Sequence, residues 1–288
     1  VSGVAAPVEM DGVRIHYHRV QWLRRLYFSR SLTIALWRRL PWADLVHSHA
    51  MFLYPGLAAA RLSACRGKPC IIAPRGMLVP ELIAGKSTFL KQAWLRLFER
   101  GNLAGASALH FTSQREQDDF ARLGLPARQQ WIVPNGLDLG AAPDAAPAED
   151  QEILFIGRVN WKKGLDRLIL ALPHEPQARL TIVGNDEERY TPVLMKLAAD
   201  CGVLARVHFA GHANATQKAA LLRRARLLAL PSRSENFGNV VLEAWAAARA
   251  VLVTPEVGLA DAVKTCGGGV VAEGEPTALG AALRSLLD

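Results

Sequence analysis

Two glutamates, Glu235 and Glu243, lie eight residues apart in a segment that changes from strand-like to helix-like composition. The apolar run 226–230 is followed by Pro231 and Ser232, which end a strand, and a polar loop then leads into a helix. Eight residues slightly exceed two helical turns, so both carboxylates share a face if both are helical. If Glu235 lies in the loop, both can still reach one ligand. The ordinary alternative is a strand–loop–helix unit with solvated carboxylates.

The start of this helix is expected at Gly238, directly after Phe237. A residue without a side chain leaves the first backbone N–H groups accessible, and the helix dipole favours an anion at that end. The segment therefore predicts an anion site flanked by carboxylates.

Residues 235–244 resemble the signature E-x-F-G-x-x-x-x-E-A of the retaining glycosyltransferases of the GT-B fold, the glycosyltransferase group 1 or GT4 family. The resemblance implies that Glu235 binds the donor sugar and that Glu243 binds the ribose hydroxyls of the nucleotide. It also implies that the backbone at and after Phe237 faces the donor phosphate and sugar. The donor-binding residues expected there are Phe237, Gly238, Asn239 and Val240.

A second segment, 156–164, resembles the family pattern G-R-L-x-x-x-K-G. Gly157 and Arg158 are expected to follow the first strand of their domain, and Lys163 is expected to begin the next helix. Two cations at this place can neutralise a diphosphate as it becomes the leaving group. Since no Asp-x-Asp metal motif is present in the sequence, we expect these cations in place of magnesium, and neither a metal nor a cofactor. The alternative is a pair of surface charges.

The first half of the chain offers further polar groups at expected strand ends. Arg75 and Gly76 lie in a Pro-Arg-Gly-Met-Leu run that a subgroup of the resembling family carries, at a position that contacts donor or acceptor. Arginine suits a phosphate, although it can equally be a solvated loop residue. His47 and His49 end another strand, and they are expected to line the interdomain cleft, because a zinc site would need further ligands.

The composition suits a two-domain α/β protein of 288 residues with half of its residues apolar. No apolar run approaches the roughly 20 residues that span a bilayer. Residues 1–138 carry 18 basic against 9 acidic residues, a net charge of +9, whereas the rest carry 16 against 17. This asymmetry suggests an anionic partner for the first half, such as a membrane surface or a lipid-linked phosphate, and no nucleic acid is expected. The scattered cysteines match no zinc or Cys-x-x-Cys pattern, which favours buried reduced thiols and a cytoplasmic location: Cys65, Cys70, Cys201 and Cys266.

Residues 19–42 lie within a stretch that contains seven arginines and no acidic residue between Gly12 and Ala43. Aromatic residues interleave with the arginines. This composition suits a helix in an anionic membrane interface on the inner face of the cell membrane. A surface helix that packs its aromatic side chains on the sheet is an equal alternative.

The predicted organisation is GT-B, with two Rossmann-like domains whose parallel sheets face a cleft. An incomplete N-terminal, acceptor-side domain covers residues 1–138, a linker rich in Ala and Pro covers 139–150, and a nucleotide-sugar domain covers 151–288. A first strand and a glycine-rich loop, usual in this family, are not visible. We therefore expect a fragment that lacks the first β-α units, with a C-terminus that is also truncated.

The resulting prediction is a retaining, metal-independent hexosyltransferase that uses a UDP- or GDP-sugar. Its expected catalytic residues are Arg158, Lys163 and Glu235. The acceptor is expected to be a glycan or a lipid-linked molecule, in the assembly of surface polysaccharide or lipopolysaccharide. Three alternatives of similar fold remain: a nucleotide-sugar epimerase, a phosphorylase, for which no pyridoxal lysine site is found, and an inactive fragment that binds nucleotide or glycan.

Overall fold

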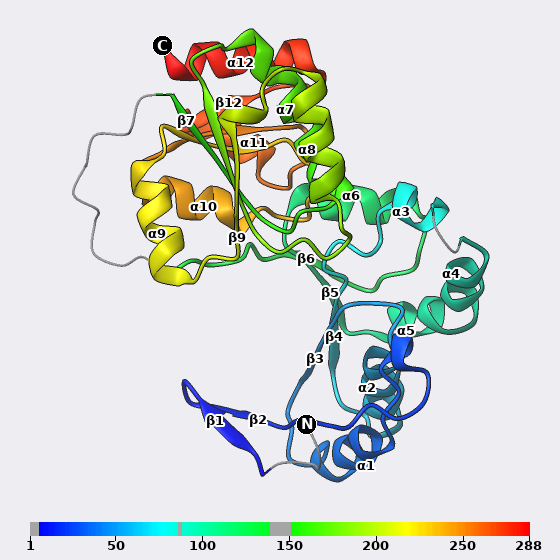
Figure 1. Ribbon diagram of the computed structural model, residues 1–288. Helices are drawn as coiled ribbons and strands as arrows, with labels where there is room; N and C mark the ends of the chain where they lie inside the picture. The colour runs from blue at the N-terminus through cyan, green and yellow to red at the C-terminus, as the bar shows by residue number, and fades with distance from the viewer. Residues whose placement is uncertain (1–5, 86–87, 139–150) are drawn as a thin grey trace. The chain divides into compact units, whose positions relative to one another are not determined.

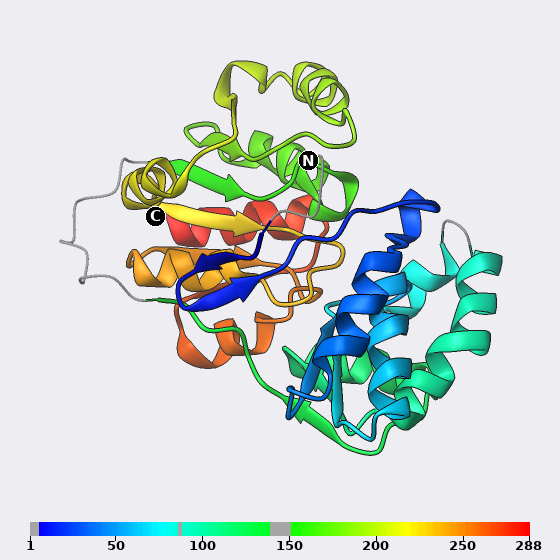
Figure 2. The same cartoon turned by 90° about the horizontal axis from the view of Figure 1, so that it is seen from below.

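The computed structural model describes residues 6–85, 88–138 and 151–288. It divides the chain into two compact units, Val1–Pro134 and Asn135–Asp288, each built on a parallel sheet (Figures 1 and 2). The prediction of an α/β protein with two parallel sheets is confirmed. The linker predicted over 139–150 lies outside the described residues.

The first unit contains a four-stranded parallel sheet in the order β3-β4-β5-β6 and a separate antiparallel hairpin β1-β2. The strands are β1 (Val8–Met10), β2 (Val13–Ile15), β3 (Val46–His49), β4 (Cys70–Ala73), β5 (Ala108–Phe111) and β6 (Gln130–Ile132). The helices are α1 (Arg30–Arg39), α2 (Tyr54–Cys65), α3 (Pro80–Ala84), α4 (Thr88–Trp94), α5 (Arg100–Gly105) and α6 (Gln114–Arg122).

The two faces of this sheet differ. Alternate residues of a strand point to opposite faces, and one face packs Ile72, Leu109 and Phe111 into the core of the unit. Helices α1, α2 and α5 all lie to one side of the sheet (Figure 1). The other face presents His47 and His49, which are exposed. The chemistry-bearing side chains of this unit therefore lie on the face that the core does not use.

The helical segment from Thr88 to Gly105 is not one regular helix. Between α4 and α5 the chain forms a π-helical turn, Leu95–Glu99, whose extra residue shifts the helical register. Trp94 and Phe98 are half-buried, whereas Leu90 and Leu97 are exposed.

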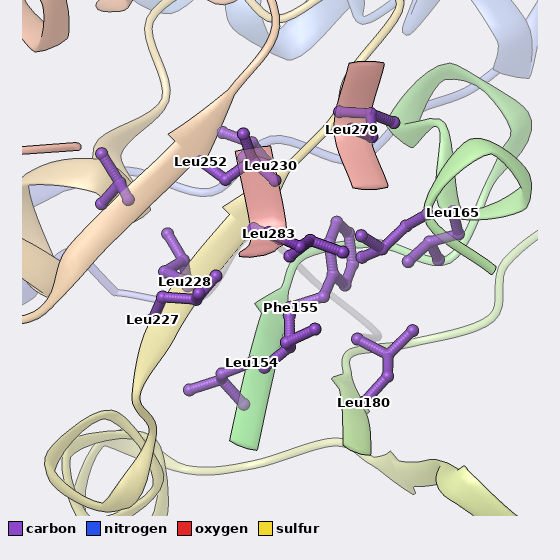
Figure 3. Packing of buried hydrophobic residues seen from close by; sticks show 14 of the residues in the cluster. Leu154, Phe155, Leu165, Leu180, Leu227, Leu228, Leu230, Leu252, Leu279 and Leu283 are labelled. Carbon is purple, nitrogen blue, oxygen red and sulfur yellow. The ribbon is translucent and has the colours of Figure 1, made fainter. Parts of the chain in front are cut away.

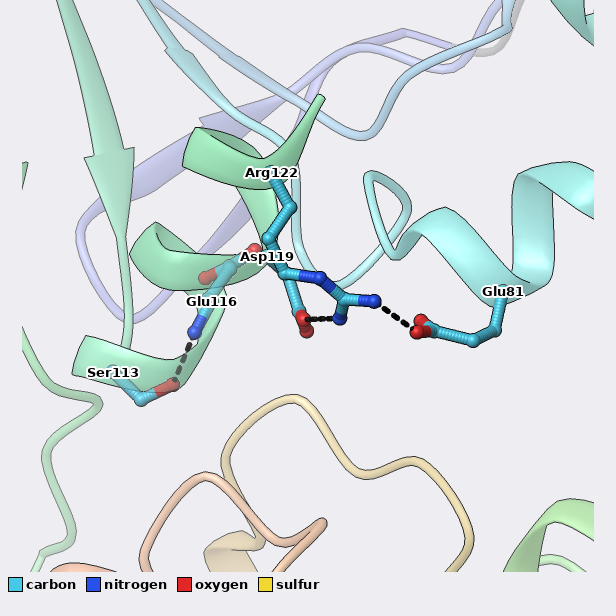
Figure 4. Close-up of polar contacts among 5 residues, drawn as sticks. All are labelled: Glu81, Ser113, Glu116, Asp119 and Arg122. Atoms are coloured by element: carbon cyan, nitrogen blue, oxygen red, sulfur yellow. Dashed lines mark hydrogen bonds and ion pairs between the residues drawn. The ribbon is translucent and has the colours of Figure 1, made fainter. Parts of the chain in front are cut away.

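Helix α6 has a side-chain cap at its N-terminal end. The hydroxyl of Ser113 accepts a hydrogen bond from the backbone N–H of Glu116 at 3.2 Å (Figure 4). At the other end of α6, Arg122 forms ion pairs with Asp119 on its own helix and with Glu81 on α3, and these contacts tie the two helices together (Figure 4).

The second unit is a six-stranded parallel sheet in the order β12-β11-β10-β7-β8-β9. Its strands are β7 (Glu152–Ile156), β8 (Arg179–Val183), β9 (Val207–Gly211), β10 (Leu227–Leu230), β11 (Ala250–Val253) and β12 (Gly269–Val271). Its helices are α7 (Leu165–Ala171), α8 (Thr191–Asp200), α9 (Ala215–Arg224), α10 (Asn239–Ala246), α11 (Ala260–Cys266) and α12 (Pro276–Leu287). In Figure 1, α7 and α8 lie on one side of this sheet and α9 and α10 on the other, as right-handed crossovers require when the strand order reverses.

The core of the second unit explains the apolar runs of its strands. All four residues of β10 are buried, and Phe155, Leu165 and Leu283 pack around the sheet (Figure 3). Each fully buried leucine or phenylalanine contributes about 1.5–3 kcal/mol relative to an exposed one. Because both faces are covered, the strands show no polar alternation.

Candidate active site

The candidate site of the second unit lies where the strand order reverses. Strand β7 pairs with β8 on one side and with β10 on the other. In parallel sheets, ligands bind in the crevice beyond the carboxyl ends of strands at such a switch point. Since β7 ends at Ile156 and β10 at Leu230, the loops that follow these two residues flank the crevice.

The loop after β7 holds Lys163 in a different place from the one predicted. Lys163 does not begin a helix: it closes the 3-10 turn Trp161–Lys163, and α7 starts at Leu165. The intervening Gly164 has φ 65°, a left-handed conformation that ends the turn before the helix begins. Gly157 is the first residue of this loop, and its N–H donates to the carbonyl of Val183 at 2.9 Å.

The loop after β10 holds Glu235 outside the helix. The N–H of Glu235 donates to the carbonyl of Glu256 at 3.1 Å, and its carbonyl accepts from the N–H of Gly258 at 3.0 Å. Gly238, with φ 94°, is the N-cap of α10, as predicted from its position in the sequence. Glu235 is therefore fixed by backbone pairing, whereas Glu243 lies within α10 itself.

A pocket of about 250 Å³ lies between these loops. Inside it, the ammonium of Lys163 forms an ion pair with the carboxylate of Glu235. The two side chains are only 16% and 18% exposed. The pocket is lined by Asn135, Ile156, Lys163, Glu235, Asn236, Phe237, Gly238, Asn239 and Val240.

This arrangement combines three means of holding an anion near a polar ligand. Lys163 supplies a positive charge, and the N-terminal end of α10, at Gly238 and Asn239, supplies the positive end of a helix dipole. Glu235 supplies hydrogen-bond acceptors and keeps the ammonium in place. Because the pair is mostly buried, removing one partner leaves the other charge without compensation, which is strongly unfavourable.

Arg158 is not brought to this pocket. Its guanidinium forms an ion pair with Glu187 at 3.2 Å, and the two side chains are 65% and 55% exposed. Glu187 follows β8, so Arg158 points toward the neighbouring loop. The predicted convergence of Arg158 with Lys163 therefore has no counterpart in this structure, and the catalytic role of Arg158 stays a prediction.

Glu243 lies in a second pocket, of about 280 Å³, between α9 and α10. Its carboxylate accepts a hydrogen bond from the ammonium of Lys218 at 2.8 Å. Lys218 could not be selected from the sequence, because only the packing of α9 beside α10 places it near Glu243. The amide of Asn135 was missed as well: it donates to the side-chain oxygen of Asn239 at 3.0 Å and so reaches the first pocket.

Arg75 and Gly76 lie in the first unit, in the loop after β4. Arg75 has a left-handed backbone with φ 55°, and its Nε donates to Nδ1 of His49 at 3.1 Å. The N–H of Gly76 donates to the buried carboxylate of Glu116 at 2.6 Å, and the same carboxylate accepts from the N–H of Thr112 at 2.8 Å. A buried acid on α6 thus holds a strained loop in place.

Three histidines gather on the exposed face of the first sheet. His47 and His110 lie 3.2 Å apart through their ring nitrogens, and the rings of His47 and His49 are 4.3 Å apart. Burial lowers the pKa of His47, and the nearby His49, His110 and Arg75 lower it further. Burial and then Arg75 lower the pKa of His49 in the same way. These lowered pKa values favour the neutral form of both rings.

The basic segment 19–42 is only partly helical. Left-handed residues at Leu23 and Tyr27 break the chain, so α1 covers only Arg30–Arg39 of the predicted helix. Trp22 and Trp42 are 71% and 87% exposed. The guanidinium of Arg66, at the C-terminal end of α2, stacks over the ring of Trp37 in α1. The distance from Cζ of Arg66 to the ring centroid is 3.5 Å.

The cysteines are all free thiols, but the prediction that they are buried holds only for Cys70. Cys65 and Cys266 are exposed at the ends of α2 and α11, and Cys201 is half-buried. Helix ends lie near the surface even when the helix body packs on a sheet, which is why spacing alone misjudged them.

Within residues 6–85, 88–138 and 151–288, no group of three or more His, Cys, Asp and Glu side chains could hold a metal ion. In the same residues, none of the helices has the length and apolar character required to cross a bilayer.

Two units that are each built on a parallel α/β sheet place this chain in the GT-B class of glycosyltransferase folds, which its solved structural neighbours share. The chain belongs to the family of group 1 glycosyl transferases. The family model described as glycosyl transferases group 1 matches residues 142–288, and the model described as glycosyl transferase 4-like domain matches residues 2–136.

Curated relatives carry several glycosyltransferase activities. The chain is 30% identical to the GDP-mannose:cellobiosyl-diphosphopolyprenol alpha-mannosyltransferase of Xanthomonas campestris, over 71% of this chain and 54% of the relative. It is 39% identical to the glycogen synthase of Mycobacterium tuberculosis, over 92% of this chain and 63% of the relative. The chain thus spans between half and two thirds of the length of these relatives.

Solved structures share the fold at lower identity. HepE of Anabaena, in complex with UDP and glucose, has a TM-score of 0.73 at 21% identity, covering 90% of this chain and 72% of that one. Sucrose-phosphate synthase of Thermosynechococcus elongatus has a TM-score of 0.76 at 22% identity, covering 99% and 77%. These likenesses concern the fold alone.

Proposed function

We propose that this protein transfers a hexose from a nucleotide-sugar donor to a glycan or lipid-linked acceptor, with retention of anomeric configuration and without a metal ion. The observation that carries the proposal is the mostly buried ion pair between Lys163 and Glu235 at the N-terminus of α10. It places a cation, a helix dipole and a carboxylate around one pocket, which suits a sugar bound to a diphosphate.

The proposed chemistry follows from charge. As the bond between the anomeric carbon and the diphosphate oxygen breaks, the sugar becomes oxocarbenium-like and the diphosphate gains negative charge. Lys163 and the helix end at Gly238 stabilise that charge on the leaving group. Glu235 accepts hydrogen bonds from sugar hydroxyls and orients the ring. In this proposal the acceptor attacks from the face that the diphosphate leaves.

The nucleotide portion is assigned to the second pocket. Glu243 accepts hydrogen bonds from the ribose hydroxyls there, in competition with the ammonium of Lys218. The proposal of a UDP- or GDP-sugar is supported by the names of relatives: HepE is described with UDP-glucose, and the Xanthomonas enzyme is a GDP-mannose transferase. The diphosphopolyprenol acceptor of that enzyme supports a lipid-linked acceptor and a role in surface polysaccharide assembly.

A donor screen tests the proposal. UDP- and GDP-hexoses are incubated with the protein and candidate polyprenyl-diphosphate glycans, and product is followed by mass spectrometry and anomeric proton NMR. We expect a product with the anomeric configuration of its donor, at an unchanged rate in EDTA. An inverted product, or a rate that EDTA abolishes and magnesium restores, would contradict the corresponding part of the proposal. Release of free nucleotide sugar of altered configuration without acceptor would indicate an epimerase instead.

A further inference from the structure

A second ion pair joins the two loops that form the pocket. The guanidinium of Arg233 binds both carboxylate oxygens of Asp166, with Nη1–Oδ1 and Nη2–Oδ2 distances of 2.7 Å each. The side chains are 30% and 23% exposed. Asp166 lies three residues after Lys163, and Arg233 lies two residues before Glu235. The bidentate geometry fixes orientation as well as distance.

Arg233 also holds the backbone around Lys163. Its Nη1 donates to the carbonyl of Trp161 at 3.0 Å, and its own N–H donates to the carbonyl of Lys162 at 2.7 Å. Arg233 therefore makes hydrogen bonds to two backbone carbonyls of the 3-10 turn that ends at Lys163. It also binds the carboxylate of Asp166.

The loops are in direct backbone contact beside this pair. A Cβ atom placed on Gly164 would overlap the carbonyl oxygen of Pro231. On its far side the β10 loop is secured to the end of β11, because the hydroxyl of Thr254 donates to the carbonyl of Ser232 at 2.6 Å, and both side chains are fully buried. The β10 loop is thus a rigid support on which the β7 loop rests.

We propose that Arg233 and Asp166 form a positioning clamp, which holds the ammonium of Lys163 against the carboxylate of Glu235 in the geometry that the leaving diphosphate requires. Neither residue of the clamp lines the pocket, so both act through Lys163 rather than on a substrate. The inference rests on the proposed function for its catalytic consequence, but the placement of Lys163 can be measured without any substrate.

The physical reason is the reach of a lysine side chain. Its four-carbon stem is flexible, and an ammonium bonded to a single carboxylate retains rotamer freedom. Electrostatic stabilisation of a leaving group is effective only when the charge is held in place before the reaction. Fixing the backbone at residues 161–166 reduces the conformations in which Lys163 can leave Glu235.

Competitive acetylation measures this placement. The protein is labelled with limiting acetic anhydride, and peptide mass spectrometry gives the rate at each lysine. Lys196, whose side chain is 78% exposed, serves as the reference, and Lys218 reports on the rest of the same unit. The variants are Arg233→Ala, Arg233→Lys and Asp166→Asn. The matched control is Arg284→Ala, which breaks the pair between Arg284 and Glu175 elsewhere in the unit.

We expect Arg233→Ala and Asp166→Asn to raise the acetylation rate of Lys163 by roughly tenfold, the equivalent of one lost hydrogen bond to a charged group. Arg233→Lys should give an intermediate rate, and the control and both other lysines should keep the wild-type rates. An unchanged rate at Lys163, or an equal rise at all three lysines, would overturn the clamp.

Kinetics separate the clamp from the proposed function. With a donor found in the screen, the clamp variants should lower kcat about tenfold and change the donor KM less than about threefold, since the effect falls on the transition state. If the clamp variants raise the acetylation rate of Lys163 but leave kcat unchanged, the clamp does not contribute to catalysis. If Lys163→Ala itself leaves transfer intact, the proposed function fails, and the acetylation result still decides whether the clamp exists.

Discussion

The ammonium of Lys218 on α9 lies 2.8 Å from the carboxylate of Glu243 on α10. This pair occupies the pocket that we assign to the ribose, so a nucleotide that binds Glu243 must compete with Lys218. The two helices are consecutive in the unit but are separated along the chain by β10, and only the fold brings these charges together.

Glu243→Ala should weaken the binding of UDP or GDP about tenfold, because a charged hydrogen-bond acceptor for the ribose is lost. Isothermal titration calorimetry with the free nucleoside diphosphate gives the Kd directly. Asp261→Ala, an exposed acid on α11, is the control and should bind as the wild type does. Equal affinity in Glu243→Ala would remove the ribose assignment.

Lys163→Ala and Glu235→Ala should each slow transfer, the former by roughly 10²–10³-fold in kcat, as for other preorganised charge stabilisers. Glu235→Ala should alter nucleotide affinity less than it alters kcat, because its proposed contact is to the sugar. Steady-state rates with the best donor of the screen test both. Lys196→Ala supplies the matched control, and comparable rates in all four proteins would refute the site.

Gly164→Ala should destabilise the second unit by several kcal/mol, since it combines left-handed strain with the overlap on Pro231. Gly202→Ala is a matched control: φ is 70° there and a Cβ would meet nothing within 4 Å. That variant should lose only about 1–2 kcal/mol, from strain alone. Urea unfolding of both variants measures the difference, and equal losses would show that the loops do not touch.

The clamp should also make stability depend on pH. Burial of Asp166 opposes its ionisation, but the hydrogen bonds and charge of Arg233 outweigh burial and lower its pKa. A carboxyl with a lowered folded pKa stabilises the fold fully above its unfolded pKa of about 4, and this contribution disappears as the pH falls through the folded value.

Asp166→Asn should therefore reduce the free energy of unfolding by about 1–3 kcal/mol at pH 7. The gap between wild type and variant should close on acidification below that unfolded value. Denaturant titrations across this range test the sign, and a gap that widens toward low pH would contradict the assignment.

Anionic vesicles should retain the protein through residues 19–42. Flotation with vesicles that contain phosphatidylglycerol should recover it at low salt and lose it at high salt, because exposed charges are screened within about 10 Å at 0.1 M salt. Replacing Trp22 and Trp42 by serine should reduce recovery, whereas Trp131→Ser, outside the segment, should not. Failure to float at low salt would eliminate the membrane proposal.

The sequence predicted the second unit well, because its signals are local. The apolar run 226–230 predicted the strand that the structure shows as β10, and Gly238 correctly marked the start of α10. Lys163 and Glu235 could be selected from their resemblance to family motifs. Their ion pair, however, forms only because strands β7 and β10 are neighbours in the sheet.

What the sequence could not give was the direction of long side chains and the contacts of non-adjacent elements. Arg158 follows Gly157 at the strand end, but its side chain turns to Glu187 on the next loop, which no local pattern encodes. Lys218 pairs with Glu243, 25 positions away in the chain, and Arg233 pairs with Asp166, 67 positions away. The predicted helix over 19–42 is broken before α1 by left-handed backbone at Leu23 and Tyr27, residue types that give no such signal.

The backbone contact between Gly164 and Pro231 limits how the protein can be redesigned. Insertions or randomised codons in either of these two loops would disturb both, so libraries aimed there should yield mostly unfolded clones. Ala215 and Ala219 of α9 line the pocket that contains Glu243, and they lie outside both of these loops. Engineering of a new nucleotide preference should begin on that helix.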